Sequence, residues 1–316
     1  MKLSAAVHSY VTLKRSLGAV YDSELRILQS FARAAGDIAV EAIEASAARD
    51  FCRGSGPPTG WWPAKHRVLQ GFFRHLVARG HLALSPLPEP PPRISSAFQP
   101  HIYSRAELQQ LLDATEILAD HRRPLRPETF RTLLLLLYAA GLRPGEGLRL
   151  RLCDTDLAGR VLTIWNTKFS KSRLVPIGTS LCEALRTYRQ ARLHLPRSDG
   201  DRSSLFPSGG GGALSYAQLY RAFVRLREHV GIVHPPDARW QPRLHDLRHT
   251  FAVHRLVAWY REGVDVQARL PWLATYLGHV GLAGTQAYLT MTPELLAEAS
   301  LRFQRYAALG EPGDPQ

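Results

Sequence analysis

Six residues between Arg143 and Tyr288 have side chains suited to phosphate chemistry. They are Arg143, Lys168, His245, Arg248, His279 and Tyr288. Breaking a phosphodiester requires a nucleophile, cations around the non-bridging oxygens and an acid for the leaving oxygen. A tyrosine hydroxyl can attack phosphorus, and an arginine fork can hold two phosphate oxygens. The set therefore predicts a cationic phosphate site beside an attacking hydroxyl.

Each of these residues also has an ordinary structural interpretation. Arg143 follows Gly-Leu and could hold the last carbonyls of a helix, and Tyr288 alone is typical of a core aromatic residue. The order and spacing of the set favour the chemical interpretation. His245 and Arg248 stand three residues apart on a predicted helix and so share one face, while His279 ends a helix nine residues before Tyr288.

Lysine is rare in this chain. Only five of the 40 basic residues are lysines, and Lys168 and Lys171 both fall within one short strand-turn-strand stretch. Arginine is effectively never deprotonated, whereas lysine can give up a proton. Either the two lysines lie at a loop tip by chance, or a proton donor is needed at this position.

Composition indicates a two-domain protein with a polyanionic partner. The chain has 316 residues, a net charge of +13 and a pI near 10.1, and the basic excess is shared by both parts of the chain. Cys52, Cys153 and Cys182 lie far apart and are expected to be reduced and buried, which points to the cytoplasm. The apolar run at 132–140 is too short for a membrane span, and neither a signal peptide nor a metal or cofactor motif stands out.

A proline-rich stretch at 86–100 is the predicted linker between two domains. Residues 1–85 are expected to form a four-helix domain, with one helix capped by Asp22 or Ser23 and charged solvated faces carrying Lys14, Arg15, Lys65, His66 and Arg67. Residues 101–308 are expected to be mainly helical with one small antiparallel sheet built from 160–165 and 172–177. Helices are expected at 105–115, 128–140, 180–193, 215–230, 245–262, 270–277 and 293–306, and a disordered tail at 309–316.

Four segments, in order, resemble the boxes of the tyrosine recombinase (phage integrase) family. "GLRPGE" resembles the first arginine box, "TKFSKSRLVPI" the lysine hairpin, "HDLRHTFA" the His-x-x-Arg box, and "LATYLGH" with "TQAYLTM" the final histidine and the tyrosine nucleophile. The last stretch is also similar to integrases of transposon-like elements. This chain has Gly145 where the family often has serine, and Phe169 where it often has glycine. The match to "RLVPI" favours Lys168 over Lys171 as the active lysine.

The resemblance implies a mechanism without ATP, metal or cofactor. Tyr288 attacks the scissile phosphorus, forms a 3′-phosphotyrosyl link and releases a 5′-hydroxyl. Arg143, Arg248 and His279 stabilise the non-bridging oxygens, and His245 orients the phosphate or helps to take the tyrosine proton. Lys168 protonates the leaving oxygen, and Glu146 braces the cluster from behind.

The resemblance also implies an assembly on double-stranded DNA recombination sites. A clamp of both domains closes on the duplex, and four protomers exchange strands through a Holliday junction, with accessory recombinases as further partners. The residues expected to contact DNA are Lys14, Arg15, Lys65, Arg67, Lys171 and Arg173. The helix at 293–306 could dock on a neighbouring protomer or pack on its own domain. Localisation is expected to be cytoplasmic, at the nucleoid.

Three other functions are compatible with parts of the pattern. His245 and His249 stand at i and i+4 with an acid between them, as in a zinc hydrolase, but Arg248 in the same turn would repel a dication. A non-catalytic DNA-binding protein would need only the basic surface. A type IB topoisomerase would share the chemistry and relax supercoils as a monomer.

Overall fold

The chain forms two compact units, Met1–Phe98 and Gln99–Gln316. The division falls within the proline-rich stretch expected to be the linker. The structure, a computed structural model, describes residues 1–55, 61–87, 100–119, 126–165, 172–194, 199–209, 212–235, 240–279, 281–290, 295, 297–298 and 300–301. Each unit has a core of its own.

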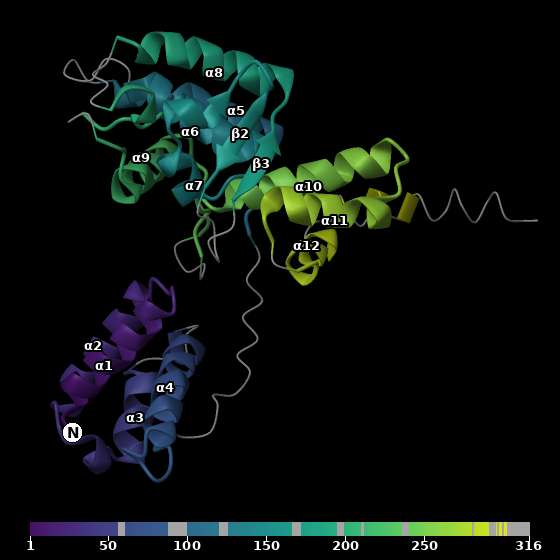
Figure 1. Ribbon diagram of the computed structural model, residues 1–316. Coiled ribbons are helices and arrows are strands. Elements are labelled where there is room, and N and C mark those ends of the chain that lie inside the picture. The colour runs from purple at the N-terminus through teal and green to yellow at the C-terminus, as the bar shows by residue number, and fades with distance from the viewer. Residues whose placement is uncertain are drawn as a thin grey trace, which may run out of the picture. The chain divides into compact units, whose positions relative to one another are not determined.

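Within its described residues, the first unit is built from helices joined by short loops (Figure 1). It consists of α1 (Leu3–Ser16), α2 (Asp22–Ala35), a 3₁₀ turn (Val40–Ala42), α3 (Ala45–Arg53) and α4 (Trp61–Ala78). Apolar side chains recurring at helical spacing, such as Leu28 and Phe31 in α2 and Leu69, Phe72 and Phe73 in α4, face inward and are fully buried. Helical periodicity thus explains this unit.

Two local predictions for this unit are wrong. Neither Asp22 nor Ser23 caps α2, because the helix begins at Asp22 and the preceding Tyr21 takes a left-handed conformation without a side-chain cap. His66, expected on a solvated face, is only 6% exposed, because it lies on the same side of α4 as Leu69 and Phe73.

The second unit is mainly helical around one small sheet. Its first helices are α5 (Arg105–Asp113), a 3₁₀ turn (Ala114–Leu118), α6 (Arg126–Ala139), α7 (Pro144–Arg149) and a 3₁₀ turn (Leu152–Asp154). Ser104 caps α5 as expected, since its hydroxyl accepts from the Glu107 amide and the Glu107 carboxylate accepts from the Ser104 amide. The short α7, which follows Arg143, was not predicted.

The sheet has three antiparallel strands in the order β1 (Thr155–Asp156), β2 (Val161–Ile164) and β3 (Arg173–Pro176). Leu162 pairs with Val175, and both are buried. The mainly helical class with a small antiparallel sheet is therefore confirmed, with β1 as an additional strand.

The later helices are α8 (Thr179–Arg192), a 3₁₀ turn (Gly200–Arg202), α9 (Tyr216–His229), α10 (Asp246–Arg261), α11 (Val266–Leu277), α12 (Ala283–Gln286) and the 3₁₀ helix η6 (Ala287–Thr290). In Figure 1, α10 and α11 lie side by side, and α12 lies next to α11. Most of the helix expected at 293–306 is outside the described residues, as is the expected tail at 309–316.

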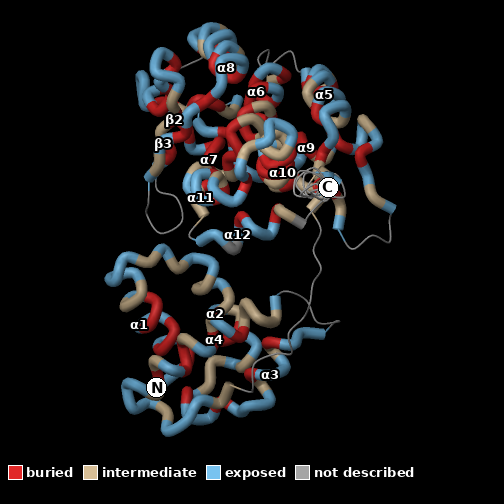
Figure 2. The backbone as a smooth tube through the Cα atoms, turned by 90° about the vertical axis from the view of Figure 1, so that its right-hand side faces the viewer, coloured by how far each residue is buried: buried red, intermediate tan, exposed pale blue. Residues whose placement is uncertain are grey.

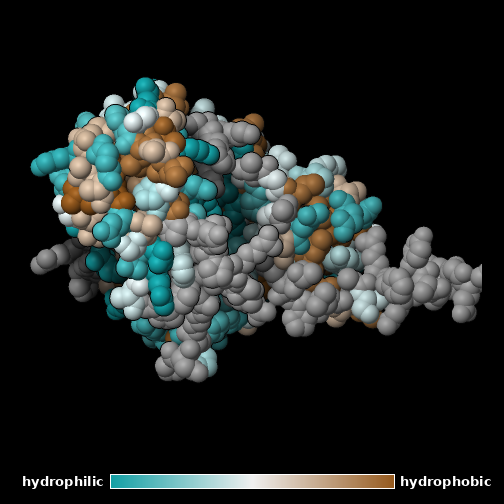
Figure 3. Space-filling model, turned by 90° about the horizontal axis from the view of Figure 1, so that it is seen from below, coloured by the Kyte–Doolittle hydropathy of each residue, from teal (hydrophilic) through white to brown (hydrophobic). Residues whose placement is uncertain are grey.

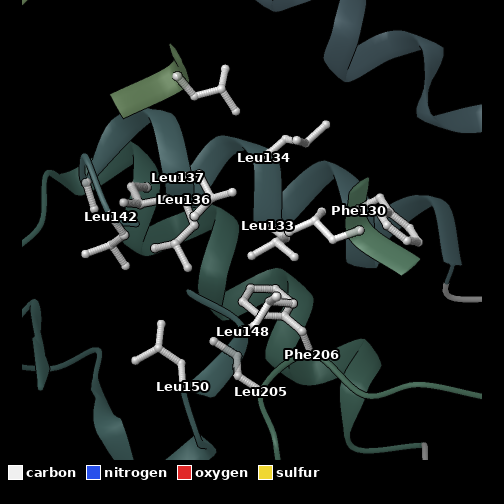
Figure 4. Close-up of a cluster of buried hydrophobic side chains, with 14 of the residues drawn as sticks. Phe130, Leu133, Leu134, Leu136, Leu137, Leu142, Leu148, Leu150, Leu205 and Phe206 are labelled. Atoms are coloured by element: carbon white, nitrogen blue, oxygen red, sulfur yellow. The ribbon is translucent and has the colours of Figure 1, made fainter. Parts of the chain in front are cut away.

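The core of the second unit is centred on α6. Figure 4 shows Leu133, Leu136 and Leu137 of this helix facing Leu148, Leu150 and Phe206, and Figure 2 shows buried residues gathered inside the unit. The apolar run at 132–140 is thus a core helix, as predicted. Within the described residues, no helix has the length and apolar character to cross a membrane.

The surfaces mix hydrophilic and hydrophobic residues, as the face in Figure 3 shows. Exposed large side chains include Leu17, Trp61, Trp165 and Trp272.

Two cysteines, Cys52 and Cys182, are buried as expected. Cys153 is exposed, so the prediction that all three are buried is wrong for this residue.

Candidate active site

Arg143 is positioned by the turn between α6 and α7. Gly141 has φ +58°, and a Cβ there would lie 2.5 Å from Phe251, so only glycine fits this close approach. Arg143 then takes an extended conformation ahead of Pro144, the first residue of α7. Its Nη2 donates to the Gly278 carbonyl at 3.2 Å. The side chain therefore links the start of α7 to the end of α11.

Glu146 is the buried acid that braces the arginines. It is 3% exposed, and its Oε1 accepts from Arg143 Nη1 at 2.8 Å. Arg173 Nη1 and Nη2 donate to its two oxygens at 3.0 and 2.9 Å. Burial would raise the pKa of this carboxyl, but the two arginines outweigh burial and lower it to about 2. Glu146 is therefore ionised.

Arg248 on α10 is almost completely buried, at 2% exposure. Its Nη1 donates to the Gly141 carbonyl at 2.8 Å, and its Nη2 donates to the Leu277 carbonyl at 2.6 Å. Burial, followed by the nearby Arg143 charge, lowers its pKa to about 10, which leaves it cationic at neutral pH. Arg248, rather than Arg143, holds the carbonyl of the turn that ends α6.

His279 follows the left-handed Gly278 that ends α11. Its Nδ1 lies 2.8 Å from Thr285 Oγ1, and its ring stacks on Tyr288 at a centroid distance of 6.1 Å. Burial and then the Arg248 charge lower its pKa to about 4, so the ring is neutral at physiological pH. A neutral ring with a proton on Nε2 can donate to a phosphate oxygen.

Tyr288 on η6 lies inside this cluster, brought there by its own chain. Its ring is 2% exposed, and its hydroxyl lies 3.2 Å from His249 Nδ1. Burial raises the pKa of the phenol, while the Arg248 guanidinium opposes that rise through its charge and a hydrogen bond. The structure thus brings together Arg143, Arg248, His279 and Tyr288.

His245 and His249 lie one turn apart at the start of α10, with ring centroids 5.0 Å apart at 78°. The tyrosine hydroxyl contacts His249, a residue considered in the sequence only as a metal ligand. The spacing of "HDLRH" was a signal for His249, because a residue four positions after His245 shares its helical face. Burial is the first cause that lowers the pKa of each ring to about 4.

The lysine hairpin cannot be placed, because Lys168 and Lys171 lie outside the described residues. Arg173, expected to contact DNA, has a side chain that is only 11% exposed. Its Nε donates to the Tyr276 carbonyl at 3.0 Å, and its other nitrogens bind Glu146. In this arrangement Arg173 supports the interior of the site.

The other residues expected to contact DNA lie on the first unit. Arg15 Nη2 binds the exposed Asp22 at 2.6 Å, and Lys14 lies over the Tyr10 ring. Lys65 is half-buried, since its Nζ donates to the Phe51 carbonyl at 2.8 Å and lies over the Phe51 ring. Arg67, two residues further along α4, is exposed.

A pocket of about 600 Å³ opens beside Glu146, between α7 and the sheet. Three exposed arginines and one exposed aromatic side chain contribute to its lining, namely Arg149, Arg151, Arg202 and Trp165. The Trp165 indole donates to Asp154 at 2.7 Å. Positive charge therefore continues from the buried arginines to the surface of this unit.

A model of the phage integrase family matches residues 103–294. The y4rB protein of Sinorhizobium fredii, named as an integrase/recombinase, is 38% identical over 312 residues, covering 95% of this chain and 96% of that protein. The chain belongs to the phage integrase family of tyrosine recombinases. This is a family of site-specific recombinase enzymes. The tyrosine recombinase XerC of Oceanobacillus iheyensis is 30% identical over 75% of this chain and 72% of its own length.

Solved tyrosine recombinase structures share the fold. The Tn1549 transposon integrase, in complex with a circular intermediate DNA, matches with a TM-score of 0.68 at 17% identity, covering 95% of this chain and 99% of that one. A lambda integrase dimer bound to a COC′ core site matches with a TM-score of 0.66 at 17% identity, covering 92% and 78%. At these identities the likeness concerns the fold.

Among the described residues, no group of three or more histidine, cysteine, aspartate or glutamate side chains is placed to hold a metal ion. The pair His245 and His249, considered as a possible zinc motif, instead packs ring against ring beside Tyr288.

Proposed function

We propose that this recombinase cleaves and rejoins duplex DNA through a 3′-phosphotyrosyl link on Tyr288. The observation that carries the proposal is the position of the Tyr288 hydroxyl. It lies beside the buried Arg248 and 3.2 Å from His249, among side chains that neutralise a phosphate. A phenol placed against fixed cations is suited to attack phosphorus and to leave again on rejoining.

In this proposal the cations act on the non-bridging oxygens. Arg143 and Arg248 are held by Glu146 and by the carbonyls of Gly141, Gly278 and Leu277, so little reorganisation is needed as charge develops. His279 donates to the same oxygens. Lys168 protonates the leaving 5′ oxygen, and the bond energy retained in the phosphotyrosyl link makes ATP unnecessary.

The assembly belongs to the same proposal. Four protomers join two recombination sites, exchange strands through a Holliday junction and act at the nucleoid, with accessory recombinases where the site requires them. A mobile element is the proposed setting, supported by the similarity of the stretch around Tyr288 to integrases of transposon-like elements. Leu295 is buried in the same core cluster as Tyr288. The burial of Leu295 favours packing of this residue on its own domain rather than on a neighbouring protomer.

The test is capture of a covalent protein–DNA adduct on duplexes that scan the DNA flanking the gene, each with a nick that traps cleavage. Wild-type protein should form an adduct resistant to denaturing detergent at one strand position. Tyr288→Phe should bind the same DNA with unchanged affinity and form none. An equal adduct with Tyr288→Phe would refute the assignment of the nucleophile.

The closest alternative, a type IB topoisomerase, shares this chemistry and needs a separate experiment. Plasmids with and without the mapped site are incubated with the protein, and relaxation and strand exchange are scored. A recombinase should join two site-bearing duplexes and leave the site-free plasmid supercoiled. Relaxation of the site-free plasmid at the same rate would support the topoisomerase.

A further inference from the structure

Tyr288 Oη and His249 Nδ1 are 3.2 Å apart, a separation that permits direct proton transfer. We propose that His249 is the proton acceptor for Tyr288, taking the phenolic proton on Nδ1 as the oxygen attacks phosphorus. This inference rests on the proposed function, because it assigns the activation of the same nucleophile.

His249 is better placed for this role than His245, which the sequence favoured. His245 packs edge-on against the His249 ring, whereas His249 itself faces Tyr288 at a ring distance of 5.5 Å. His245 is the residue immediately before α10 and His249 lies in the first turn of that helix, so both rings are positioned by the start of α10. The arrangement places His245 behind His249 as a positioning residue, and His249 against the nucleophile.

The titratable and charged groups that face His249 come from four elements: Arg243 from the loop before α10, Arg248 and His245 at the start of α10, His279 after α11, and Tyr288 on η6. Burial and the nearby cations disfavour an imidazolium, so the ring is a free base at physiological pH. With its proton on Nε2, the neutral ring presents the Nδ1 lone pair to the hydroxyl.

The same surroundings link proton transfer to DNA binding. In the DNA-free protein burial and then the surrounding cations oppose protonation of His249, and burial raises the pKa of Tyr288, so Tyr288 stays a neutral phenol. A phosphodiester bound between Arg143 and Arg248 adds negative charge and favours the imidazolium. Tyr288 is therefore activated when a phosphate occupies the site.

Every bond and proton is accounted for in both cleavage and rejoining. On cleavage, the Tyr288 O–H bond breaks, its proton moves to His249 Nδ1, and the Oη electron pair forms the bond to phosphorus. The P–O5′ bond then breaks, and the leaving oxygen takes a proton from Lys168. On rejoining, the 5′-hydroxyl gives a proton to Lys168 and attacks phosphorus, and the tyrosine oxygen recovers its proton from His249.

The experiment measures single-turnover adduct formation between pH 6 and pH 10 on the nicked duplex mapped with wild-type protein. His249→Ala should lower the rate at neutral pH by about 10²–10⁴-fold, the usual contribution of a positioned base. The difference in rate between His249→Ala and wild-type protein should narrow as pH rises, because a growing fraction of the Tyr288 phenol then ionises without a base. Added imidazole should restore part of the rate in His249→Ala and leave wild type unchanged.

A second variant keeps the test valid if His249→Ala does not fold. His249→Asn places an amide oxygen near the position of Nδ1, which can accept the hydrogen bond but cannot carry the proton. It should fold, bind DNA and remain slow at neutral pH. His254→Ala is the matched control on the same helix, since His254 contacts Tyr138 at 2.9 Å, and it should keep the wild-type rate.

The assignment of His249 as proton acceptor would be overturned if both His249 variants formed the adduct at the wild-type rate. It would also be overturned if their rate were lowered equally at every pH and did not respond to imidazole. These results differ from failure of the proposed function. In that case wild-type protein would form no adduct on any duplex, or Tyr288→Phe would still form one.

Discussion

Arg173 and Glu146 form a two-pronged ion pair between residues 27 positions apart in the chain, with both guanidinium nitrogens within 3.0 Å of a carboxylate oxygen. The pair joins strand β3 to helix α7, and Arg143 binds the same carboxylate. Because Glu146 is almost completely buried, its charge is stabilised by these arginines rather than by water. One acid thus fixes two cations of the site.

Glu146→Ala should therefore destabilise the second unit by about 3–5 kcal/mol, because it leaves the poorly exposed Arg173 without a carboxylate to balance its charge. Urea denaturation measures the change. Asp113→Ala is the control, since its pair with Arg131 is exposed on both sides and should contribute little. Equal, small effects of the two variants would contradict the bracing role of Glu146.

Acid should weaken the fold in two successive pH ranges. His245, His249 and His279 have folded-state pKa values of about 4, below the ordinary 6.5, so the unfolded chain takes up protons first and stability falls as pH drops from about 6.5 towards 4. Glu146, with its pKa lowered from 4.5 to about 2, contributes stability above pH 4.5 that is lost as pH falls through 2.

The free energy of unfolding, measured by urea denaturation at a series of pH values, tests this order. The Glu146 contribution amounts to about 3 kcal/mol for a shift of this size. Glu146→Gln should reduce the loss of stability in the lower range, where other carboxylates with lowered pKa values such as Glu107 still contribute, and should keep the upper range. Constant stability between pH 7 and pH 5 would show that the histidines are not held neutral.

Gly141→Ala should destabilise the protein more than Gly231→Ala. Both glycines have positive φ, +58° and +72°, so each alanine costs about 1–2 kcal/mol in backbone strain. Only at position 141 does the added Cβ meet another side chain, Phe251 at 2.5 Å, whereas position 231 has open space. Thermal unfolding compares the two, and adduct formation should fall only for Gly141→Ala because Arg143 and Arg248 flank that turn.

Arg67→Ala and Lys65→Ala should separate DNA contact from packing on helix α4. Arg67 is exposed, so its loss should weaken DNA binding and reduce the slope of log affinity against log salt by about 1. Lys65 is tied to Phe51, so its loss should lower stability and leave the salt slope nearly unchanged. Fluorescence anisotropy at several salt concentrations makes the comparison, and identical slopes for all three proteins would refute the DNA contact of Arg67.

The sequence by itself determined the features that depend on neighbouring residues. The cap at Ser104, the end of α6 near Gly141 and the pairing of β2 with β3 follow from local hydrogen bonding, backbone preference and side-chain periodicity. The order of arginine, histidine and tyrosine boxes likewise indicated the family, which the family model and the relatives confirm.

Tertiary structure alone decided which side chains meet. His249 and Tyr288 are 39 residues apart, and their contact depends on how the end of α11 returns the chain to α10. From its place in the sequence Arg173 is expected to be a surface cation. In the structure its side chain points inward because it pairs with the buried carboxylate of Glu146. Charge pairing and burial involve segments that are distant in the sequence. The partners of such side chains are therefore decided only when those segments pack together.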